Sequence, residues 1–329
     1  MNTIKYFING RSALDQGIKL LSLKKSSKIL VPEIICDVAV KVLLKNKLDV
    51  VYYKLDKKFQ PIWSDLYKKS FKNVSCVLMV HFFGYPQNIS KLKKLTKKKN
   101  IYLIEDNCHS LNIKHRGNIL GLTGDIGIDS PRKIIENLYS GGRLFINIKN
   151  NYKFEYIEKY KPNLLKQFKN IIKRKLPNFT KKIKFVGNRP KYESPYLFSD
   201  KDNNFLVKQI DKISKNRLNK INLKKESMKR IKLFNEIDKF AKKNKIKSVF
   251  KINKNLIPMY FVGIAKNQHY VKKIFNWGWR NEIEIVSWPS FYTGKNLKKN
   301  LLKRWSKYIC IPLNQVFFSK NKKINFDLE

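Results

Sequence analysis

The stretch Ile101-Tyr102-Leu103-Ile104-Glu105-Asp106 decides the fold class. An apolar run that ends in an acid is typical of a buried parallel strand at the point where it leaves its sheet. In open α/β sheets, ligands bind just beyond the carboxyl ends of such strands. Asp106 is therefore expected at the mouth of a binding site, in the motif Asp106-Asn107-Cys108-His109.

Strand-like and helix-like patterns alternate around this stretch. The predicted strands cover residues 28–31, 49–53, 76–81, 101–105, 127–130 and 143–148, and the predicted helices cover residues 10–23, 34–44 and 89–98. Alternation of this kind is typical of an α/β protein, in which helices sandwich a mostly parallel sheet. That is the fold class we expect.

The C-terminal part carries a second set of patterns. A helix is predicted over residues 222–244, a strand over 258–265, and helices over 271–277 and 297–305. We therefore expect a large domain over residues 1–215 and a smaller α+β domain over residues 216–329. Within the large domain, residues 151–215 contain helical patches broken by prolines, so this region stays unassigned between helix and loop.

Composition and charge leave two interpretations. The chain has 329 residues, of which 43% are hydrophobic and 13% aromatic, enough to bury a large core. Its formal charge of +47, from 71 Lys+Arg against 24 Asp+Glu, allows a nucleic-acid or anionic-membrane partner. However, lysine is spread along nearly the whole sequence, and it alternates with apolar residues at helical spacing in the densest runs. We interpret the charge as a solvated surface and expect no nucleic-acid partner.

No segment resembles a membrane anchor or a secretory signal. Every apolar run is shorter than the roughly 18 residues of a spanning helix, and residues 1–14 lack an unbroken apolar core. Cys36, Cys76, Cys108 and Cys310 have neither zinc-ligand spacing nor the pattern of a disulfide framework. We expect a cytoplasmic protein with ordinary thiols and no metal site.

Asp106 and a downstream lysine together indicate chemistry on a bound pyridoxal 5′-phosphate (PLP). A carboxylate at a strand exit can keep a pyridinium nitrogen protonated, and a lysine on a later segment can form a Schiff base with an aldehyde. Lys133, which follows Gly124-Asp125 and Ser130 and precedes Gly141-Gly142, is the candidate. It would hold PLP and later carry a proton, and both roles need a neutral amine with a lowered pKa.

The phosphate of such a cofactor needs hydrogen-bond donors. Gly10-Arg11-Ser12 enters a predicted helix, whose first N–H groups and positive dipole end attract anions, and Ser130 can add a hydroxyl group. The alternative is structural: the Gly10 turn and Asp106 would each only cap a helix. No Gly-x-x-x-x-Gly-Lys loop occurs, so ATP hydrolysis has no support.

In this order, the motifs resemble those of the DegT/DnrJ/StrS family of PLP-dependent sugar aminotransferases, in a subgroup with a Ser-x-Arg-Lys segment. The resemblance covers most of the chain and implies fold type I of the PLP-dependent transferases, the fold of aspartate aminotransferase. It rests on Gly10-Arg11-Ser12-Ala13-Leu14, Val31-Pro32, Val80-His81-Phe82-Phe83-Gly84-Tyr85-Pro86, Asp106 to His109, Gly124-Asp125, Ser130 to Lys133, Ser287-Trp288-Pro289 and Ile311-Pro312-Leu313.

The resemblance implies a role for each candidate residue. Lys133 is implied as the catalytic lysine, Asp106 as the partner of the pyridinium nitrogen, and His109 as a support of the cofactor ring near its phenolic oxygen. The implied phosphate ligands are Arg11, Ser12 and Ser130. A homodimer is implied as well.

Some positions depart from the family pattern. Many members place an aromatic ring over the cofactor shortly after the Val31-Pro32 element, where this chain has Glu-Ile-Ile-Cys at residues 33–36. The Gly-x-Asn-x-Arg segment, through which a partner subunit reaches the phosphate, has only a loose counterpart in Gly187-Asn188-Arg189. Trp288-Pro289 lies either in the substrate cleft or in the core.

The resemblance implies an aminotransferase that converts a nucleotide-linked keto-sugar into an amino-sugar in surface polysaccharide biosynthesis, with an amino acid such as glutamate as the donor. Two alternatives stay open. One is a sugar dehydratase that uses PLP or pyridoxamine 5′-phosphate (PMP), although such enzymes typically carry histidine where Lys133 stands. The other is a catalytically silent, basic binding protein that keeps the fold.

Overall fold

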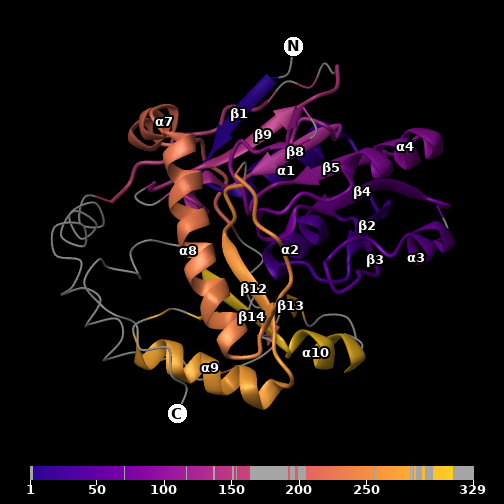
Figure 1. The fold of residues 1–329 in the computed structure, drawn as a ribbon. Helices are drawn as coiled ribbons and strands as arrows, with labels where there is room; N and C mark the ends of the chain where they lie inside the picture. The colour runs from indigo at the N-terminus through magenta and orange to yellow at the C-terminus, as the bar shows by residue number, and fades with distance from the viewer. Residues whose placement is uncertain are drawn as a thin grey trace.

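A seven-stranded sheet forms the centre of the computed structural model, in the strand order β1-β9-β8-β5-β4-β2-β3 (Figure 1). These strands are β1 (Thr3–Phe7), β2 (Lys28–Pro32), β3 (Asp49–Tyr53), β4 (Val74–Val80), β5 (Tyr102–Asp106), β8 (Ile126–Asp129) and β9 (Gly142–Ile146). The structure describes residues 3–69, 71–115, 117–135, 138–149, 152, 154–163, 192, 197–198, 205–254, 256–281, 283, 285–286, 291–292 and 299–313.

The sheet is parallel from β3 to β8 and antiparallel at the other edge. β2 pairs in parallel with β3 and β4, β4 with β5, and β5 with β8. β9 runs antiparallel to both β8 and β1. The central strands are buried on both faces, which explains their nearly continuous apolar sequences.

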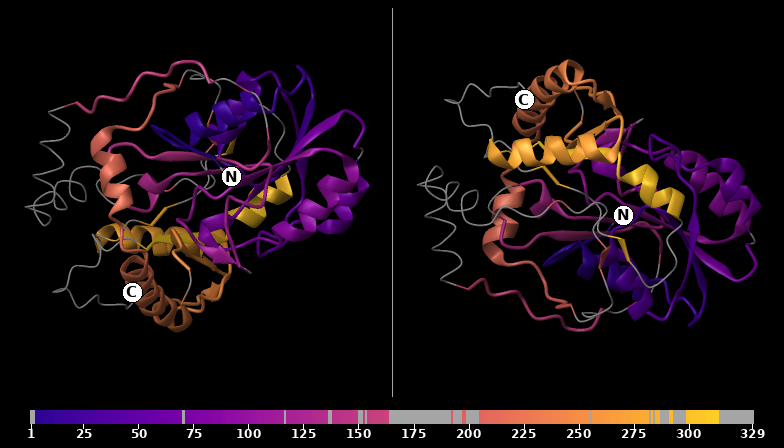
Figure 2. Two further views of the ribbon diagram at one scale, coloured as in Figure 1. Left: turned by 90° about the horizontal axis from the view of Figure 1, so that it is seen from above. Right: turned by 90° about the horizontal axis from the view of Figure 1, so that it is seen from below.

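Helices cover both faces of this sheet (Figure 2). α1 (Gly10–Leu20) packs on β8 and β9 and beside α2 (Asp37–Lys45), whereas α4 (Ile89–Lys99) packs on β4 and β5. The crossovers β2-α2-β3 and β4-α4-β5 run in opposite directions along the sheet, so right-handed connections place α2 and α4 on opposite faces. The short helix α3 (Trp63–Lys68) follows β3. Two single 3-10 turns, η1 (Phe82–Gly84) and η2 (Pro131–Lys133), follow β4 and β8.

The C-terminal part builds a sheet of its own, β11-β12-β14. Its elements are α7 (Lys212–Asn219), α8 (Leu223–Lys243), β11 (Lys247–Ser248), β12 (Tyr260–Ile264), α9 (Gln268–Arg280), α10 (Lys299–Trp305) and β14 (Tyr308–Pro312). α8 contacts β11 and β12, and α9 contacts β14. Two further pairs of short strands are β6 (Lys114–His115) with β7 (Asn118–Ile119) and β10 (Leu197–Phe198) with β13 (Phe291–Tyr292).

The predicted fold class, a mostly parallel α/β sheet sandwiched by helices, is confirmed. Two features were not predicted. One is the edge strand β1, because five residues of mixed polarity give little signal. The other is the antiparallel direction of β9 against β8, which an apolar strand pattern does not specify. The proposed division of the chain at residue 215 stays a prediction.

No helix in the described part of the chain combines the length and the apolar character that crossing a membrane requires.

Candidate active site

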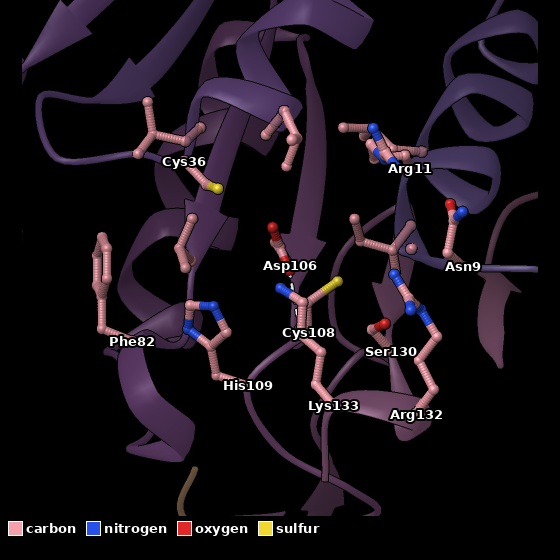
Figure 3. Close-up of a pocket in the computed structure, with 17 residues that line it drawn as sticks. Asn9, Arg11, Cys36, Phe82, Asp106, Cys108, His109, Ser130, Arg132 and Lys133 are labelled. Atoms are coloured by element: carbon pink, nitrogen blue, oxygen red, sulfur yellow. Dashed lines mark hydrogen bonds between the residues drawn. The ribbon is translucent and has the colours of Figure 1, made fainter. Parts of the chain in front are cut away.

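A pocket of about 150 Å³ opens at the carboxyl ends of β2, β4, β5 and β8 and at the start of α1 (Figure 3). Each element contributes the residues that directly follow or precede it, as expected for a parallel sheet. The lining consists of Asn9, Gly10, Arg11, Leu14, Ile35, Cys36, Val38, Ala39, Val80, Phe82, Asp106, Cys108, His109, Ile128, Ser130, Arg132 and Lys133.

Five of the six predicted site residues line this pocket. They are Lys133, Asp106, His109, Arg11 and Ser130, whereas Ser12 does not line it. The hydroxyl group of Ser12 is fully buried and donates to Oδ1 of Asn9 and to the carbonyl oxygen of Leu206, each over 3.1 Å. The Ser12 hydroxyl therefore joins the helix start to Leu206 and does not face the pocket.

Lys133 ends the turn η2, and its backbone N–H donates to the carbonyl of Ser130 over 2.9 Å. In Figure 3 its side chain reaches into the centre of the pocket, beside Cys108 and below Asp106. The side chain of Lys133 is exposed and lines the pocket, whereas the next residue, Ile134, is buried. The side-chain amine is therefore accessible to a ligand, while the backbone that carries it is held in place by the buried Ile134.

Asp106 is the last residue of β5 and is 8% exposed, with its carboxylate in the pocket. One of its oxygens, Oδ1, accepts the N–H of Cys108 over 2.8 Å. This bond orients the carboxylate and closes the turn that follows β5. No helix starts at this turn, so Asp106 does not act as the helix cap of the structural alternative. The same carboxylate lines the pocket and holds the loop.

His109 lies on the side of the pocket formed by Phe82 (Figure 3). Its Nδ1 accepts the backbone N–H of Phe83 over 3.2 Å, so that a neutral ring carries its proton on Nε2. Burial lowers the pKa of His109 well below its usual value, and the charge of Lys133 lowers it further. His109 therefore faces the pocket as a neutral imidazole at physiological pH.

The start of α1 forms the opposite end of the pocket. Asn9 caps the helix, because its side chain accepts the N–H of Ser12 over 3.0 Å. The N–H groups of Gly10 and Arg11 precede the first intrahelical bond and find no acceptor within the described residues. A side chain at residue 10 would place its Cβ 2.8 Å from the sulfur of Cys108, which explains why glycine stands there.

Two guanidinium groups face this end of the pocket, those of Arg11 and Arg132. Partial burial lowers the pKa of Arg132, and the neighbouring charge of Arg11 lowers it further. Ser130, 1% exposed, adds a hydroxyl group between the two segments. Two like charges held beside a helix N-terminus form an environment that an anion stabilises.

The middle of the pocket is apolar on both sides. Its walls include Leu14, Ile35, Val38, Ala39, Val80 and Ile128. Two thiols, those of Cys36 and Cys108, also face it, and burial raises the pKa of both. Cys36 stands in the region where the family resemblance led us to look for an aromatic ring.

Other predicted motif residues support the site from below. Asp125 accepts the N–H of Leu103 over 2.7 Å and pairs with Lys93 over 2.5 Å, so the Gly-Asp motif anchors the start of β5. Gly142 packs against Asn9: a Cβ there would lie 2.2 Å from the carbonyl carbon of Asn9. The Ile311-Pro312-Leu313 segment belongs to and follows β14, which pairs with β12.

Two predicted segments, Gly187-Asn188-Arg189 and Ser287-Trp288-Pro289, lie outside the described residues. Among the residues that are described, no group of three or more His, Cys, Asp or Glu is placed to hold a metal ion.

Among the residues that line the pocket, sequence reasoning assigned no site role to Asn9, Cys36, Phe82 and Cys108. Asn9 could have been found, because asparagine directly before a predicted helix is a strong N-cap signal. Phe82 and the two cysteines carry no such signal, since an apolar residue near a strand end usually packs into the core. Arg132 was named only as part of the Ser130 to Lys133 segment and was given no site role.

Fold and site together define an α/β protein with the architecture of the fold-type-I PLP-dependent aminotransferases. More specifically, residues 6–155 match the model of the DegT/DnrJ/EryC1/StrS aminotransferase family. The predicted family is thereby confirmed, and the predicted subgroup stays a prediction.

Two curated relatives match only part of the chain. The GDP-perosamine synthase of Escherichia coli O157:H7 is 24% identical over 119 residues, which are 36% of this chain and 33% of the relative. The GDP-4-keto-6-deoxy-D-mannose 3-dehydratase of Yersinia pseudotuberculosis is 28% identical over 105 residues, 32% of this chain and 27% of the relative. The matches thus span a third or less of these relatives.

Solved structures match nearly the whole chain in fold. The aminotransferase TlmJ from Streptoalloteichus hindustanus has a TM-score of 0.66 at 13% identity, with 95% of this chain and 80% of TlmJ covered. NtdA from Bacillus subtilis, solved with bound PMP, has a TM-score of 0.65 at 14% identity, with 95% of this chain and 69% of NtdA covered.

Proposed function

We propose that the protein is a PLP-dependent aminotransferase that acts on a nucleotide-linked keto-sugar. The observation that carries this proposal is the meeting of Lys133, Asp106 and His109 in one pocket whose far end holds Arg11 and Arg132. PLP needs three kinds of protein group. Its aldehyde needs a lysine, its pyridine nitrogen needs a carboxylate, and its phosphate needs an anion-binding end such as the two arginines provide.

The pocket lining fits the proposed cofactor. Its apolar walls suit an aromatic ring, Asp106 suits a protonated ring nitrogen, and the two arginines suit a phosphate. The unpaired N–H groups of Gly10 and Arg11, within the described residues, point to the same end. Ser130 would assist them, whereas Ser12 would act only by supporting the turn.

Each residue then has a defined task. Lys133 would hold the cofactor through Nζ and, once released, would move a proton at that atom. Asp106 would keep the ring nitrogen protonated, a charge-assisted hydrogen bond worth roughly 1.5–3 kcal/mol. His109, held neutral, would donate from Nε2. When bound, PLP supplies the electron sink that stabilises negative charge on the carbon bearing the amino group.

The substrate class follows from the family and its named relatives. Because both relatives carry names of GDP-linked sugars, a GDP-linked 4-keto-sugar is the first acceptor to test, with glutamate as the donor. Amino-sugars of this kind are building blocks of surface polysaccharides, the pathway that we propose. We also propose that the enzyme is a cytoplasmic homodimer, which light scattering of the purified protein would test.

A sugar dehydratase is the second candidate, since one relative bears that name. Lys133 argues against it, because a dehydratase of this family is expected to lack a lysine at this position. The two functions differ in product: the aminotransferase adds nitrogen from glutamate, whereas the dehydratase removes a hydroxyl group.

The deciding measurement is the visible absorption spectrum of the purified protein with added PLP. We expect a band from the lysine-bound cofactor that Lys133→Ala loses and that glutamate bleaches. Mass spectrometry after addition of the GDP-linked keto-sugar should then detect an amino-sugar. No band in the wild type with excess PLP would contradict the proposal and favour the silent binding protein; a deoxygenated product would favour the dehydratase.

A further inference from the structure

Arg230 connects the C-terminal part to the turn that carries Lys133. It lies on α8 and is 6% exposed. Its guanidinium group forks between two backbone carbonyls: Nη2 donates to Ile134 over 2.5 Å and Nη1 donates to Pro258 over 2.9 Å. These two carbonyls belong to segments more than a hundred residues apart in the sequence, and one buried side chain joins them.

The first carbonyl belongs to the residue directly after Lys133. Ile134 is 2% exposed, and its own N–H donates to the carbonyl of Pro131 over 2.9 Å. The turn η2 is a single 3-10 turn, so it has few hydrogen bonds of its own. Arg230 adds a charge-assisted bond at the C-terminal end of that turn, where the direction of the Lys133 side chain is set.

The second carbonyl leads to His109. Met259, the residue after Pro258, donates its N–H to the carbonyl of Phe83 over 2.8 Å. Phe83 in turn donates its N–H to Nδ1 of His109, and it does so from a left-handed backbone conformation with φ 57°. A residue held in that conformation must be stabilised by its surroundings. Short chains of hydrogen bonds therefore connect Arg230 to the turn that carries Lys133 and to the Phe83 backbone that orients His109.

We propose that Arg230 is a positioning residue that fixes Lys133 relative to the bound cofactor; this inference rests on the proposed function. A planar guanidinium can donate to two carbonyls at once in a fixed geometry, and a lysine cannot reproduce that fork. Without it, Ile134 and Pro258 would lose a buried donor, and the amine of Lys133 would spend less time at bonding distance from the aldehyde.

The test compares two cofactor forms that differ only in the group that meets Lys133. PLP carries an aldehyde, with which the lysine amine condenses to a C=N bond with release of one water. PMP carries an amine at the same carbon and cannot make that bond, but it has the same ring and phosphate. The dissociation constants of both forms are measured by calorimetry for the wild type, Arg230→Met and Arg230→Lys.

Arg304→Met is the matched control. Arg304 also forks from the C-terminal part onto the large sheet's loops, with Nη1 to the carbonyl of Leu55 over 2.9 Å and Nη2 to Glu33 over 2.6 Å. Among the described residues, Arg304 hydrogen-bonds neither Ile134 nor Pro258, so its loss weakens the same junction and leaves the lysine turn intact.

We expect Arg230→Met to lose PLP affinity by up to about 10²-fold while PMP affinity stays essentially unchanged. Arg230→Lys should have a PLP affinity between that of this variant and that of the wild type, and Arg304→Met should bind both forms like the wild type.

If Arg230→Met does not fold, Arg230→Lys decides alone: a selective loss of PLP affinity supports the role. Equal losses of PLP and PMP, wild-type affinities in Arg230→Lys, or the same selectivity in Arg304→Met would overturn it. A wild type that binds neither form would instead overturn the proposed function.

Discussion

Phe83 donates its backbone N–H to Nδ1 of His109 over 3.2 Å, and the two rings stack with centroids 5.9 Å apart. This pair fixes both the tautomer and the orientation of the imidazole. It also explains why the His-Phe-Phe-Gly segment after β4 and the Asp106 to His109 segment after β5 occur together: they meet at neighbouring strand ends.

The first prediction concerns the pH dependence of stability. Burial lowers the pKa of His109 in the folded state, whereas in the unfolded chain it is near 6.5. Between these values the unfolded state binds more protons, so the free energy of unfolding should fall as pH drops below about 6.5, by up to roughly 1.4 kcal/mol per pH unit. Denaturant titrations of the apoprotein between pH 7.5 and about 5 measure this slope.

His109→Gln is the test variant for that slope, since its amide oxygen can still accept the N–H of Phe83 but the side chain cannot take up a proton. Its unfolding free energy should fall less between neutral and acidic pH than that of the wild type. Parallel curves for the two proteins would mean that another group controls acid stability.

The second prediction assigns Arg132 to the phosphate. Pyridoxal has the ring and aldehyde of PLP without the phosphate. Arg132→Met should therefore weaken PLP binding by roughly 10- to 100-fold, the value of one charge-assisted hydrogen bond, and leave pyridoxal binding unchanged. Calorimetric titration with both compounds measures this. Arg280→Met, at the exposed end of α9, is the control for the loss of one positive charge. An equal loss for both ligands would remove Arg132 from the phosphate site.

Local sequence signals placed three of the predicted site residues in one pocket. Asp106 ends a strand, and His109 and Lys133 come shortly after strands whose apolar patterns are strong. Parallel strands bring their carboxyl ends to one edge of the sheet. The helix start at Gly10 was predicted on the same kind of signal. These patterns could not predict which N–H groups at the helix start are free. Asn9 accepts the N–H of Ser12, and the N–H groups of Gly10 and Arg11 have no acceptor in the part of the chain that the structure describes.

Long-range contacts gave no sequence signal. Arg230 meets Ile134 across 96 residues, and one arginine among 71 basic residues is not distinguishable by composition or spacing. The direction of β9 was missed for a related reason, because an apolar strand pattern is the same in parallel and antiparallel pairs.

The third prediction concerns the buried ion pair that precedes Ser130. Nε of Arg143 donates to both carboxylate oxygens of Asp129 over 3.0 Å, and Nη2 donates to Asn112 over 2.7 Å. Burial raises the pKa of Asp129, and Arg143 opposes that rise. Arg143→Met should cost about 3–5 kcal/mol of stability at neutral pH, because an uncompensated carboxylate is left inside.

The raised pKa of Asp129 also determines how the stability of Arg143→Met changes with pH. In Arg143→Met the folded pKa of Asp129 rises further above its unfolded value of about 3.9, so the folded state binds more protons than the unfolded state. The loss of stability should therefore shrink at low pH and grow as pH rises through the folded pKa. Asp129→Asn in the same background should recover part of the stability at neutral pH. A pH-independent loss, or no recovery, would show that packing and not charge is responsible.

The fourth prediction links backbone packing to cofactor binding. A Cβ on Gly142 would lie 2.2 Å from both the carbonyl carbon and oxygen of Asn9, and main-chain atoms cannot give way as a side chain can. Gly142→Ala should therefore push the start of α1 away from β9 and destabilise the protein by about 3 kcal/mol or more. It should also weaken PLP binding, because Gly10 and Arg11 lie at that helix start.

Gly17→Ala is the matched control within α1. Its Cβ would meet only the side-chain ends of Ile126 and Leu144, and alanine favours a helix by up to about 1 kcal/mol. Urea unfolding and calorimetry on both variants separate the two effects, and comparable PLP binding in the two would mean that the helix start does not hold the phosphate.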